Sequence, residues 1–165
     1  MYVPFADLSD DARVWVYAAN RPFSPSELHP LHEGLKSFVE NWTAHNHDLK
    51  ASFTILYGQF LVLAVDENTQ NATGCSIDKS VHFLQIIEKE FGIELFNRML
   101  VFYFAGEQLI TNSRQDFGAA LQQGHVSPST TVINTLVFTK KELNDKFRLP
   151  FRDSWHAKIF GAALA

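Results

Sequence analysis

The sequence predicts an α+β fold in which a mainly antiparallel sheet of about five to seven strands is covered by about three to four helices. Strand-like segments follow one another across short turns, which antiparallel pairing permits. Other segments show helical spacing of apolar residues and begin with capping residues. The chain has 165 residues, 46% of them hydrophobic, so residues 1–165 are expected to bury one core and form a single globular domain.

The first part of the chain predicts a strand, a helix and a hairpin. Residues 13–18 are β-branched and aromatic, as in a strand. Ser24-Pro25-Ser26-Glu27 is a capping box, and the apolar residues that follow at spacings of three and four predict an amphipathic helix of about 20 residues. Residues 51–57 and 60–66 flank Gly58-Gln59, the spacing expected of a hairpin with glycine at a positive φ.

The middle of the chain predicts two more helices and a second hairpin. Apolar residues from Val81 to Phe91 recur at helical spacing, and Gly92 follows them as a C-terminal cap. Residues 99–104 and 108–111 are β-rich and are separated by a short turn that contains glycine, which predicts a hairpin. A short helix is expected around residues 117–121.

The C-terminal part predicts a strand, a helix and an arm. Residues 130–139 are expected to form a strand. Thr139-Lys140-Lys141-Glu142 is a second capping box, which opens a helix that runs to about Lys146. The remaining segment, residues 150–165, is interpreted as an extended C-terminal arm.

Composition excludes several classes of partner and compartment. The net charge is -4 and the longest basic run is Lys140-Lys141, so nucleic acid is not an expected partner. Cys75 is the only cysteine, which excludes an intramolecular disulfide and fits a reducing compartment. The first residues do not resemble a secretory signal, and the longest aliphatic run, residues 60–65, is too short to span a bilayer. We therefore expect a cytoplasmic location without membrane insertion.

The segment Gly74-Cys75-Ser76-Ile77-Asp78-Lys79-Ser80 is the first place where chemistry is expected. It shares the spacing of glycine, lysine and serine with a phosphate-binding loop and lies between a predicted strand and a predicted helix. A phosphate-binding loop needs a glycine directly before its lysine, and Asp78 occupies that position with a charge that repels phosphate. The sequence therefore predicts that this chain is not a P-loop NTPase.

Four motifs carry a resemblance to a known family: Leu49-Lys50-Ala51-Ser52-Phe53, Ala64-Val65-Asp66-Glu67, residues 74–80, and Asp153-Ser154-Trp155-His156. On these motifs the chain resembles, over nearly its whole length, a family of short uncharacterised bacterial proteins that are often labelled "ABC transporter ATPase". The resemblance implies membership of that bacterial family and supplies no established mechanism. The label is not carried over, because the glycine before the lysine and a Leu-Ser-Gly-Gly-Gln signature are both missing.

The segment from Gly74 to Ser80 admits a structural and a functional interpretation. In the structural one, Gly74 makes a turn, Ser76 caps the helix, Asp78 complements its positive end, and Cys75 fills an apolar space. In the functional one, the helix N-terminus and Lys79 stabilise the Cys75 thiolate as a nucleophile. A third interpretation is binding of an anion or another ligand by the backbone amides, with Gly74, Ser76, Lys79 and Ser80 as binding residues.

A nucleophilic Cys75 requires a base from elsewhere in the chain. His156 is the best candidate, because it lies beside Trp155 on the predicted C-terminal arm, and Trp155 is itself a candidate ligand-binding residue. Asp78 or Asp153 would orient the imidazole. The structural alternative is that Trp155 and His156 are packed side chains with a hydrogen-bonded imidazole.

Other polar residues have simpler interpretations as loops and caps. His45, His47 and Asp48 lie close together at the predicted helix end, but metal ligands usually include another well-placed donor, so no metal is predicted. Asp66 and Glu67 end a predicted strand, where a carboxylate could act as a base. The favoured interpretation is that these two residues simply begin the polar loop that follows.

The leading functional hypothesis is a small ligand-binding or protein-interaction module that acts through a pocket or face near the start of the Cys75 helix. Its partner would be a small molecule or a protein, and the protein partner could be a second copy of the chain in a homodimer. No cofactor is expected. The first alternative is a cysteine-dependent hydrolase or transferase that uses Cys75 and His156. The second alternative is a metal-dependent hydrolase that uses His45 and His47.

Overall fold

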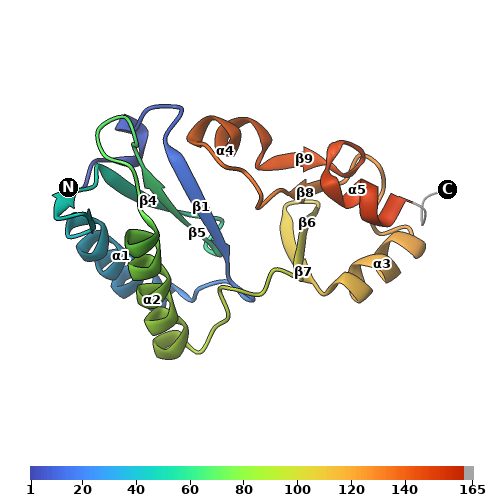
Figure 1. Cartoon of the computed structure of the whole chain (residues 1–165). Helices are drawn as coiled ribbons and strands as arrows, with labels where there is room; N and C mark the ends of the chain where they lie inside the picture. The colour runs from blue at the N-terminus through green and yellow to red at the C-terminus, as the bar shows by residue number, and fades with distance from the viewer. Residues whose placement is uncertain (162–165) are drawn as a thin grey trace. The chain divides into compact units, whose positions relative to one another are not determined.

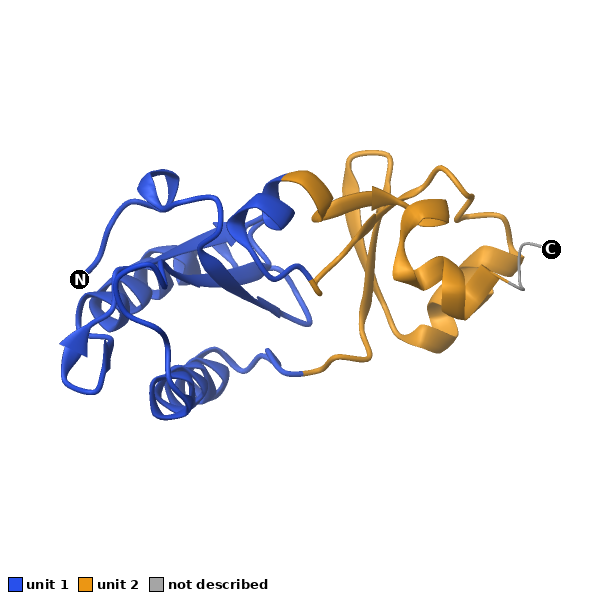
Figure 2. Cartoon of the chain, turned by 45° about the horizontal axis from the view of Figure 1, so that its top comes forward, with its two compact units in different colours: residues 1–96, 137–144 blue, residues 97–136, 145–165 orange. Residues whose placement is uncertain are grey.

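The computed structural model describes residues 1–161. Their helices and antiparallel sheets confirm the predicted α+β class (Figure 1). The residues fall into two compact units, shown in Figure 2. Unit 1 comprises Met1–Phe96 and Val137–Asn144, and unit 2 comprises Asn97–Leu136 and the chain from Asp145 onward. The single domain expected from the sequence stays a prediction, and each unit has a sheet of its own.

Unit 1 is built on a three-stranded antiparallel sheet. Its strands are ordered β1 (Arg13–Ala18), β5 (Phe60–Val65) and β4 (Ala51–Leu56). β4 and β5 form the predicted hairpin, and Tyr57 and Gly58 have φ angles of 53° and 60° in its turn, so the positive φ expected of Gly58 is confirmed. Every residue of the central strand β5 is buried, and this strand therefore forms the middle of the unit.

The first long helix, α1 (Pro25–Glu40), begins at the predicted capping box, where the Glu27 carboxylate accepts the N–H of Ser24 at 2.8 Å. The helix is 16 residues long, shorter than expected. Its end coincides with Asn41, whose side-chain amide donates to a carbonyl one turn earlier at 2.8 Å. Trp42 therefore follows the helix instead of lying within it. Two short paired strands come next, β2 (Thr43–Ala44) and β3 (His47–Asp48).

The second long helix, α2 (Gly74–Phe91), includes the predicted helix and extends toward the N-terminus through the segment from Gly74 to Ser80. Gly92 ends it in the left-handed conformation, with a φ of 60°, as predicted. α1 and α2 cover one face of the sheet (Figure 1). The helices contribute Leu31, Leu35, Val39, Leu84 and Ile87 to the core, and the strands contribute Phe53, Leu61, Leu63 and Val65.

The chain returns to unit 1 at residues 137–144 and pairs with the outer edge of β1. The N–H of Val14 donates to the carbonyl of Phe138 at 2.9 Å. The helix α4 (Lys140–Lys146) starts in this segment, and the hydroxyl of Thr139 accepts the N–H of Glu142 at 3.1 Å. The predicted N-terminal cap is thus confirmed, and one edge of the sheet is partly covered.

Lys140 is a buried cation that holds the N-terminal residues. Its side chain is 7% exposed. The ammonium donates to the carbonyls of Ala6 and Leu8 at 2.9 and 2.6 Å, which lie in or beside the short 3-10 helix η1 (Phe5–Asp7). These hydrogen bonds satisfy a charge that would be costly to bury alone, so Lys140 ties the returning segment to the start of the chain.

Unit 2 contains a four-stranded antiparallel sheet with the order β7-β6-β8-β9. The predicted second hairpin is formed by β6 and β7, and the short helix predicted around residues 117–121 is confirmed as α3. The core of the unit includes Val101, Tyr103, Phe117, Leu121, Val132 and Phe151. The elements are β6 (Val101–Ala105), β7 (Gln108–Asn112), α3 (Arg114–Gln122), β8 (Thr131–Ile133), β9 (Arg148–Pro150), η2 (Phe151–Asp153) and α5 (Trp155–Phe160).

The strands and the C-terminal segment differ from the sequence expectation in three ways. Residues 1–161 contain nine strands in three sheets, in place of one sheet of about five to seven. The strand expected over residues 130–139 is only three residues long, because Asn134 starts a turn and its side chain accepts the N–H of Leu136 at 3.1 Å. An extended arm was expected over residues 150–165, but after β9 ends at Pro150 the chain forms η2 and α5, and residues 162–165 lie outside the described part.

The helices of residues 1–161 include none that is both long and apolar enough to cross a membrane.

Two glycines of unit 1 allow a matched test of the helix boundaries. Gly92→Ala is expected to lower the free energy of unfolding by about 1 kcal/mol, because alanine is strained at a φ of 60°. Gly34→Ala, inside α1, is expected to raise it by about 0.5–1 kcal/mol, since an added Cβ would meet only Phe83 at an ordinary 3.8 Å. Urea unfolding of both variants measures the difference, and equal effects would contradict the assigned end of α2.

Candidate functional site

The segment that was expected to carry chemistry forms the first two turns of α2. Thr73 is the N-terminal cap: its hydroxyl accepts the N–H of Ser76 at 3.2 Å, and the Ser76 hydroxyl accepts the N–H of Thr73 at 2.7 Å. Ser76 was expected to be the cap itself and is instead the third helical residue of a capping box. Gly74 lies at the first helical position, where an added Cβ would meet no atom within 4 Å.

The start of α2 is fixed by Trp42. The indole N–H of Trp42 donates to the carbonyl of Ser76 at 2.8 Å, and both residues are 1% exposed. The indole also contacts two other rings, with centroid distances of 5.9 Å to Trp15 and 5.2 Å to Phe38. The first turn of α2 is thus held from its buried side, and only its outer side faces solvent.

The candidate residues of this segment divide between the two sides. Ser76 and Ser80 are buried, and the Ser80 hydroxyl donates to the Ile77 carbonyl at 2.6 Å. Cys75 and Asp78 are exposed. The expectation that Cys75 fills an apolar space is therefore wrong. The Lys79 ammonium, also exposed, lies 3.4 Å from the hydroxyl of Thr43.

His156 and Trp155 belong to α5 in unit 2, whereas Cys75 belongs to unit 1. The His156 imidazole is 2% exposed and stacks on the Trp155 ring with a centroid distance of 3.8 Å. Its Nδ1 lies 3.2 Å from the hydroxyl of Ser154, which itself donates to the Phe151 carbonyl at 2.8 Å. The Ser154 oxygen is therefore the acceptor and Nδ1–H the donor. The pairing of Cys75 with His156 stays a prediction.

Burial and, to a smaller extent, the nearby Arg114 cation together lower the pKa of His156 from 6.5 to about 4. The imidazole is therefore neutral at neutral pH. It packs against Phe117 with a centroid distance of 6.1 Å. In the same unit the Trp155 indole nitrogen is buried without a hydrogen-bond partner. These contacts match the structural alternative, in which Trp155 and His156 are packed side chains.

The histidines considered as metal ligands lie at the hairpin of β2 and β3. His45 and Asn46 occupy its turn with φ angles of 51° and 63°, and His45, His47 and Asp48 are exposed. Within residues 1–161, no group of three or more histidine, cysteine, aspartate or glutamate side chains is placed to hold a metal ion.

Asp66, considered as a carboxylate base, is committed to an ion pair. Its carboxylate is 2.9 Å from the Lys50 ammonium and accepts the backbone N–H of Asn68 at 3.1 Å. Burial acts to raise the pKa of Asp66, but the hydrogen bonds from Lys50 and Asn68 outweigh it and hold the pKa below its usual value. Glu67 accepts the N–H of Ala72 at 2.9 Å and orders the loop before α2, so both carboxylates have the structural roles favoured from the sequence.

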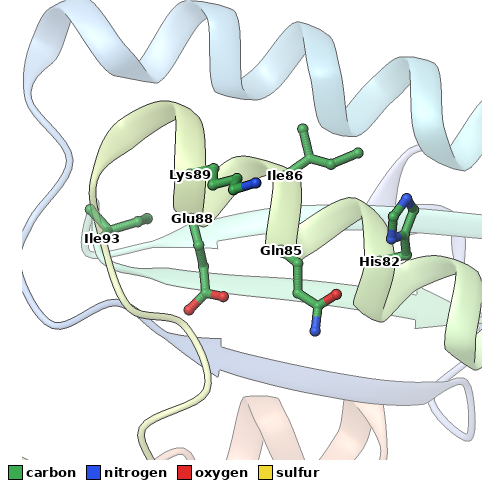
Figure 3. A pocket seen from close by; sticks show the side chains of 6 residues that line it. All are labelled: His82, Gln85, Ile86, Glu88, Lys89 and Ile93. Atoms are coloured by element: carbon green, nitrogen blue, oxygen red, sulfur yellow. The ribbon is translucent and has the colours of Figure 1, made fainter.

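A groove of about 470 Å³ runs along the second half of α2. His82, Gln85, Ile86, Glu88 and Lys89 of the helix line it together with Ile93, as Figure 3 shows. The apolar lining comes from Ile86, which is 43% exposed, and from the buried Ile93. Cys75 is not among the lining residues, so the groove lies on the predicted helix but not at its start.

Helical spacing explains how the groove arises. His82, Gln85, Ile86 and Lys89 are spaced by three, four and seven residues, which places them on one stripe of α2. Leu84 and Ile87 form the opposite stripe and enter the core. The one signal in the sequence is Ile86, an apolar residue on an otherwise polar stripe.

Comparison of the chain with models of protein families, with curated proteins and with solved structures gives no match.

The neutral, buried His156 predicts a pH dependence of stability. The unfolded chain binds a proton at this residue near pH 6.5 and the folded chain near pH 4, so the free energy of unfolding falls as the pH drops through this window. Between pH 7 and pH 5 the loss is expected to be about 2 kcal/mol. Urea unfolding at both pH values, with His156→Gln as the non-titrating comparison, measures it. An equal loss in the variant and the wild type would assign the dependence to other groups.

The exposed Cys75 predicts that its thiol is accessible in the folded state. We expect iodoacetamide to alkylate it completely without unfolding, and Cys75→Ser to change the free energy of unfolding by less than about 0.5 kcal/mol. Mass spectrometry of native and urea-unfolded protein compares the two alkylation rates. A native rate below about one hundredth of the unfolded rate would mean that the thiol is protected after all.

Proposed function

We propose that this protein is a small-molecule-binding module whose ligand occupies the α2 groove, the surface lined by His82, Gln85, Ile86, Glu88, Lys89 and Ile93. The observation that carries the proposal is the combination of a concave volume with unused polar groups. In the described part of the chain, the side chains of His82, Gln85 and Lys89 have no hydrogen-bond or ion-pair partner. These exposed groups are solvated in the unbound protein and would be available to a ligand that settles in the groove.

The size and lining of the groove support a small ligand. The groove has a volume of about 470 Å³ and is largely open to solvent, so it would hold a small ligand from one side only. Ile86 supplies exposed apolar surface at the centre of the stripe, and burying it against a ligand is favourable at roughly 25 cal/mol per Å². The polar side chains around it would fix the orientation of the ligand.

Binding is favoured over catalysis because His82, Glu88 and Lys89, the lining residues that could serve as nucleophile or base, form no hydrogen bond or ion pair with one another in residues 1–161. The cysteine-dependent hydrolase and the metal-dependent hydrolase remain predictions. The bacterial family suggested by the sequence motifs is part of this proposal, as is a cytoplasmic location. A protein partner on the same face is the rival that the experiment below separates from a small ligand.

The proposal is tested by adding a library of small organic fragments to ¹⁵N-labelled protein and recording backbone amide shifts. We expect bound fragments to move amide signals in residues 82–93, with dissociation constants in the millimolar range typical of fragments. Ile86→Arg places a large charged side chain in the groove and should weaken their binding at least tenfold, without touching the core.

Ile159→Arg is the matched control, because Ile159 is also an exposed isoleucine, at 53%, and lies in unit 2. It should leave fragment binding unchanged. Shifts scattered over the whole chain, or equal binding to Ile86→Arg and wild type, would remove the basis of the proposal. If no fragment binds but the wild type self-associates and Ile86→Arg does not, the groove is a protein interface instead.

A further inference from the structure

Arg13, the first residue of β1, lies between two aromatic rings. Its guanidinium carbon is 4.5 Å from the centroid of the Trp15 ring and 5.0 Å from that of the Phe138 ring. These two rings make no ring contact with each other in the described part of the chain, so the guanidinium separates them. All three residues belong to unit 1, and none of them lines the α2 groove. We call Arg13, Trp15 and Phe138 the Arg13 clamp.

Both rings of the clamp are positioned by the rest of unit 1. Trp15 packs against the buried Trp42 ring with a centroid distance of 5.9 Å. The backbone of Phe138 is held on both sides: its N–H donates to the Glu142 carboxylate at 2.7 Å, and its carbonyl accepts the N–H of Val14 at 2.9 Å. The guanidinium is therefore held by two positioned aromatic residues.

The hydrogen-bonding groups of the clamped guanidinium are unused. In residues 1–161, Arg13 forms no hydrogen bond and no ion pair, and the Glu142 carboxylate does not pair with it. The residue is half-buried. Its Nε is buried without a partner, whereas its two terminal nitrogens, also without a partner, reach solvent. A buried, unsatisfied donor on a cation indicates a site that an acceptor from outside the chain can complete.

The chemistry of the clamp selects the kind of acceptor. The two rings lie against the guanidinium, and its terminal N–H groups are left to make hydrogen bonds in the plane of the group. Two parallel N–H groups match two oxygens of one carboxylate or phosphate group. An arginine that is already held between rings loses less rotamer freedom on binding than a solvated one. Phe138, which is 56% exposed, adds apolar surface beside the bound group.

We propose that the Arg13 clamp is an oxyanion-binding site, separate from the α2 groove. The terminal N–H groups of Arg13 bind a carboxylate or phosphate group of a ligand. Trp15 and Phe138 are positioning residues that orient the guanidinium. The proposal does not depend on the function proposed for the α2 groove, and either can fail without the other.

The test titrates full-length ¹⁵N-labelled protein with sodium acetate and with sodium phosphate at fixed pH, with sodium chloride added to keep the ionic strength constant. The signals to follow are the Arg13 Nε–H and the indole N–H of Trp15. We expect at least one of the two anions to shift both signals saturably, with a dissociation constant in the millimolar range. Comparison of acetate with phosphate distinguishes a carboxylate ligand from a phosphate ligand.

Substitutions of Arg13 separate its charge from its geometry. Arg13→Gln should weaken anion binding by about fivefold or more, read at the Trp15 indole. Arg13→Lys keeps the charge but lacks the planar fork, and should weaken binding by about threefold. Arg152→Gln removes the same charge from an exposed arginine of unit 2 and is the matched control, which should change nothing.

Phe138→Leu tests the clamp with Arg13 in place. Because the Phe138 ring is mostly exposed, its loss should leave the fold intact, as the amide spectrum will show. Anion binding should weaken by about threefold, the size expected from one cation–π contact.

Three outcomes would overturn the proposal. If neither anion shifts the two signals, or if chloride shifts them equally, Arg13 is a packed cation only. If Arg13→Gln binds the anion as tightly as the wild type, the anion binds elsewhere. If Phe138→Leu leaves binding unchanged while Arg13→Gln abolishes it, the two rings do not act as a clamp.

Discussion

The hydrogen bond from the Trp42 indole to the Ser76 carbonyl is the contact on which the geometry of α2 depends. It is buried and links the segment that follows α1 to the first turn of α2. Losing its acceptor would leave a buried N–H unsatisfied, at a cost of about 1–3 kcal/mol. With the start of α2 fixed and Gly92 ending it, the rotation of the helix about its own axis is set, and so is the stripe that meets the sheet.

Helical periodicity then produces the core and the groove from two stripes of the same helix. Leu84 and Ile87 lie on the stripe that enters the core, so His82, Gln85 and Lys89 must lie on the stripe that faces away from it. The groove is a consequence of how the core is packed, and it carries polar groups that the fold does not use. The helix backbone is fixed, but these exposed side chains have no partners and would lose rotamer freedom when a ligand binds.

Local signals in the sequence predicted most elements and missed what depends on distant residues. The capping box at Ser24, the glycine at position 58 and the cap at Gly92 act within a few residues, and all are confirmed. The helix end at Asn41 and the short strand β8 were missed because a local side-chain hydrogen bond overrode the apolar pattern. The groove was not predicted, because the exposure of Ile86 depends on which side of α2 packs into the core. Cys75 was chosen as a candidate for the chemistry of its thiol, and the groove does not include it.

The order in which the chain visits the two units limits how the protein can be divided genetically. The polypeptide leaves unit 1 after Phe96, returns after Leu136 and leaves again after Asn144. A gene fragment that stops at Phe96 would encode the whole α2 groove but would omit Lys140, and the carbonyls of Ala6 and Leu8 would lose their donor. Unit 1 is therefore not encoded by one continuous stretch of sequence, and separating it would require joining residue 96 to residue 137 through a linker.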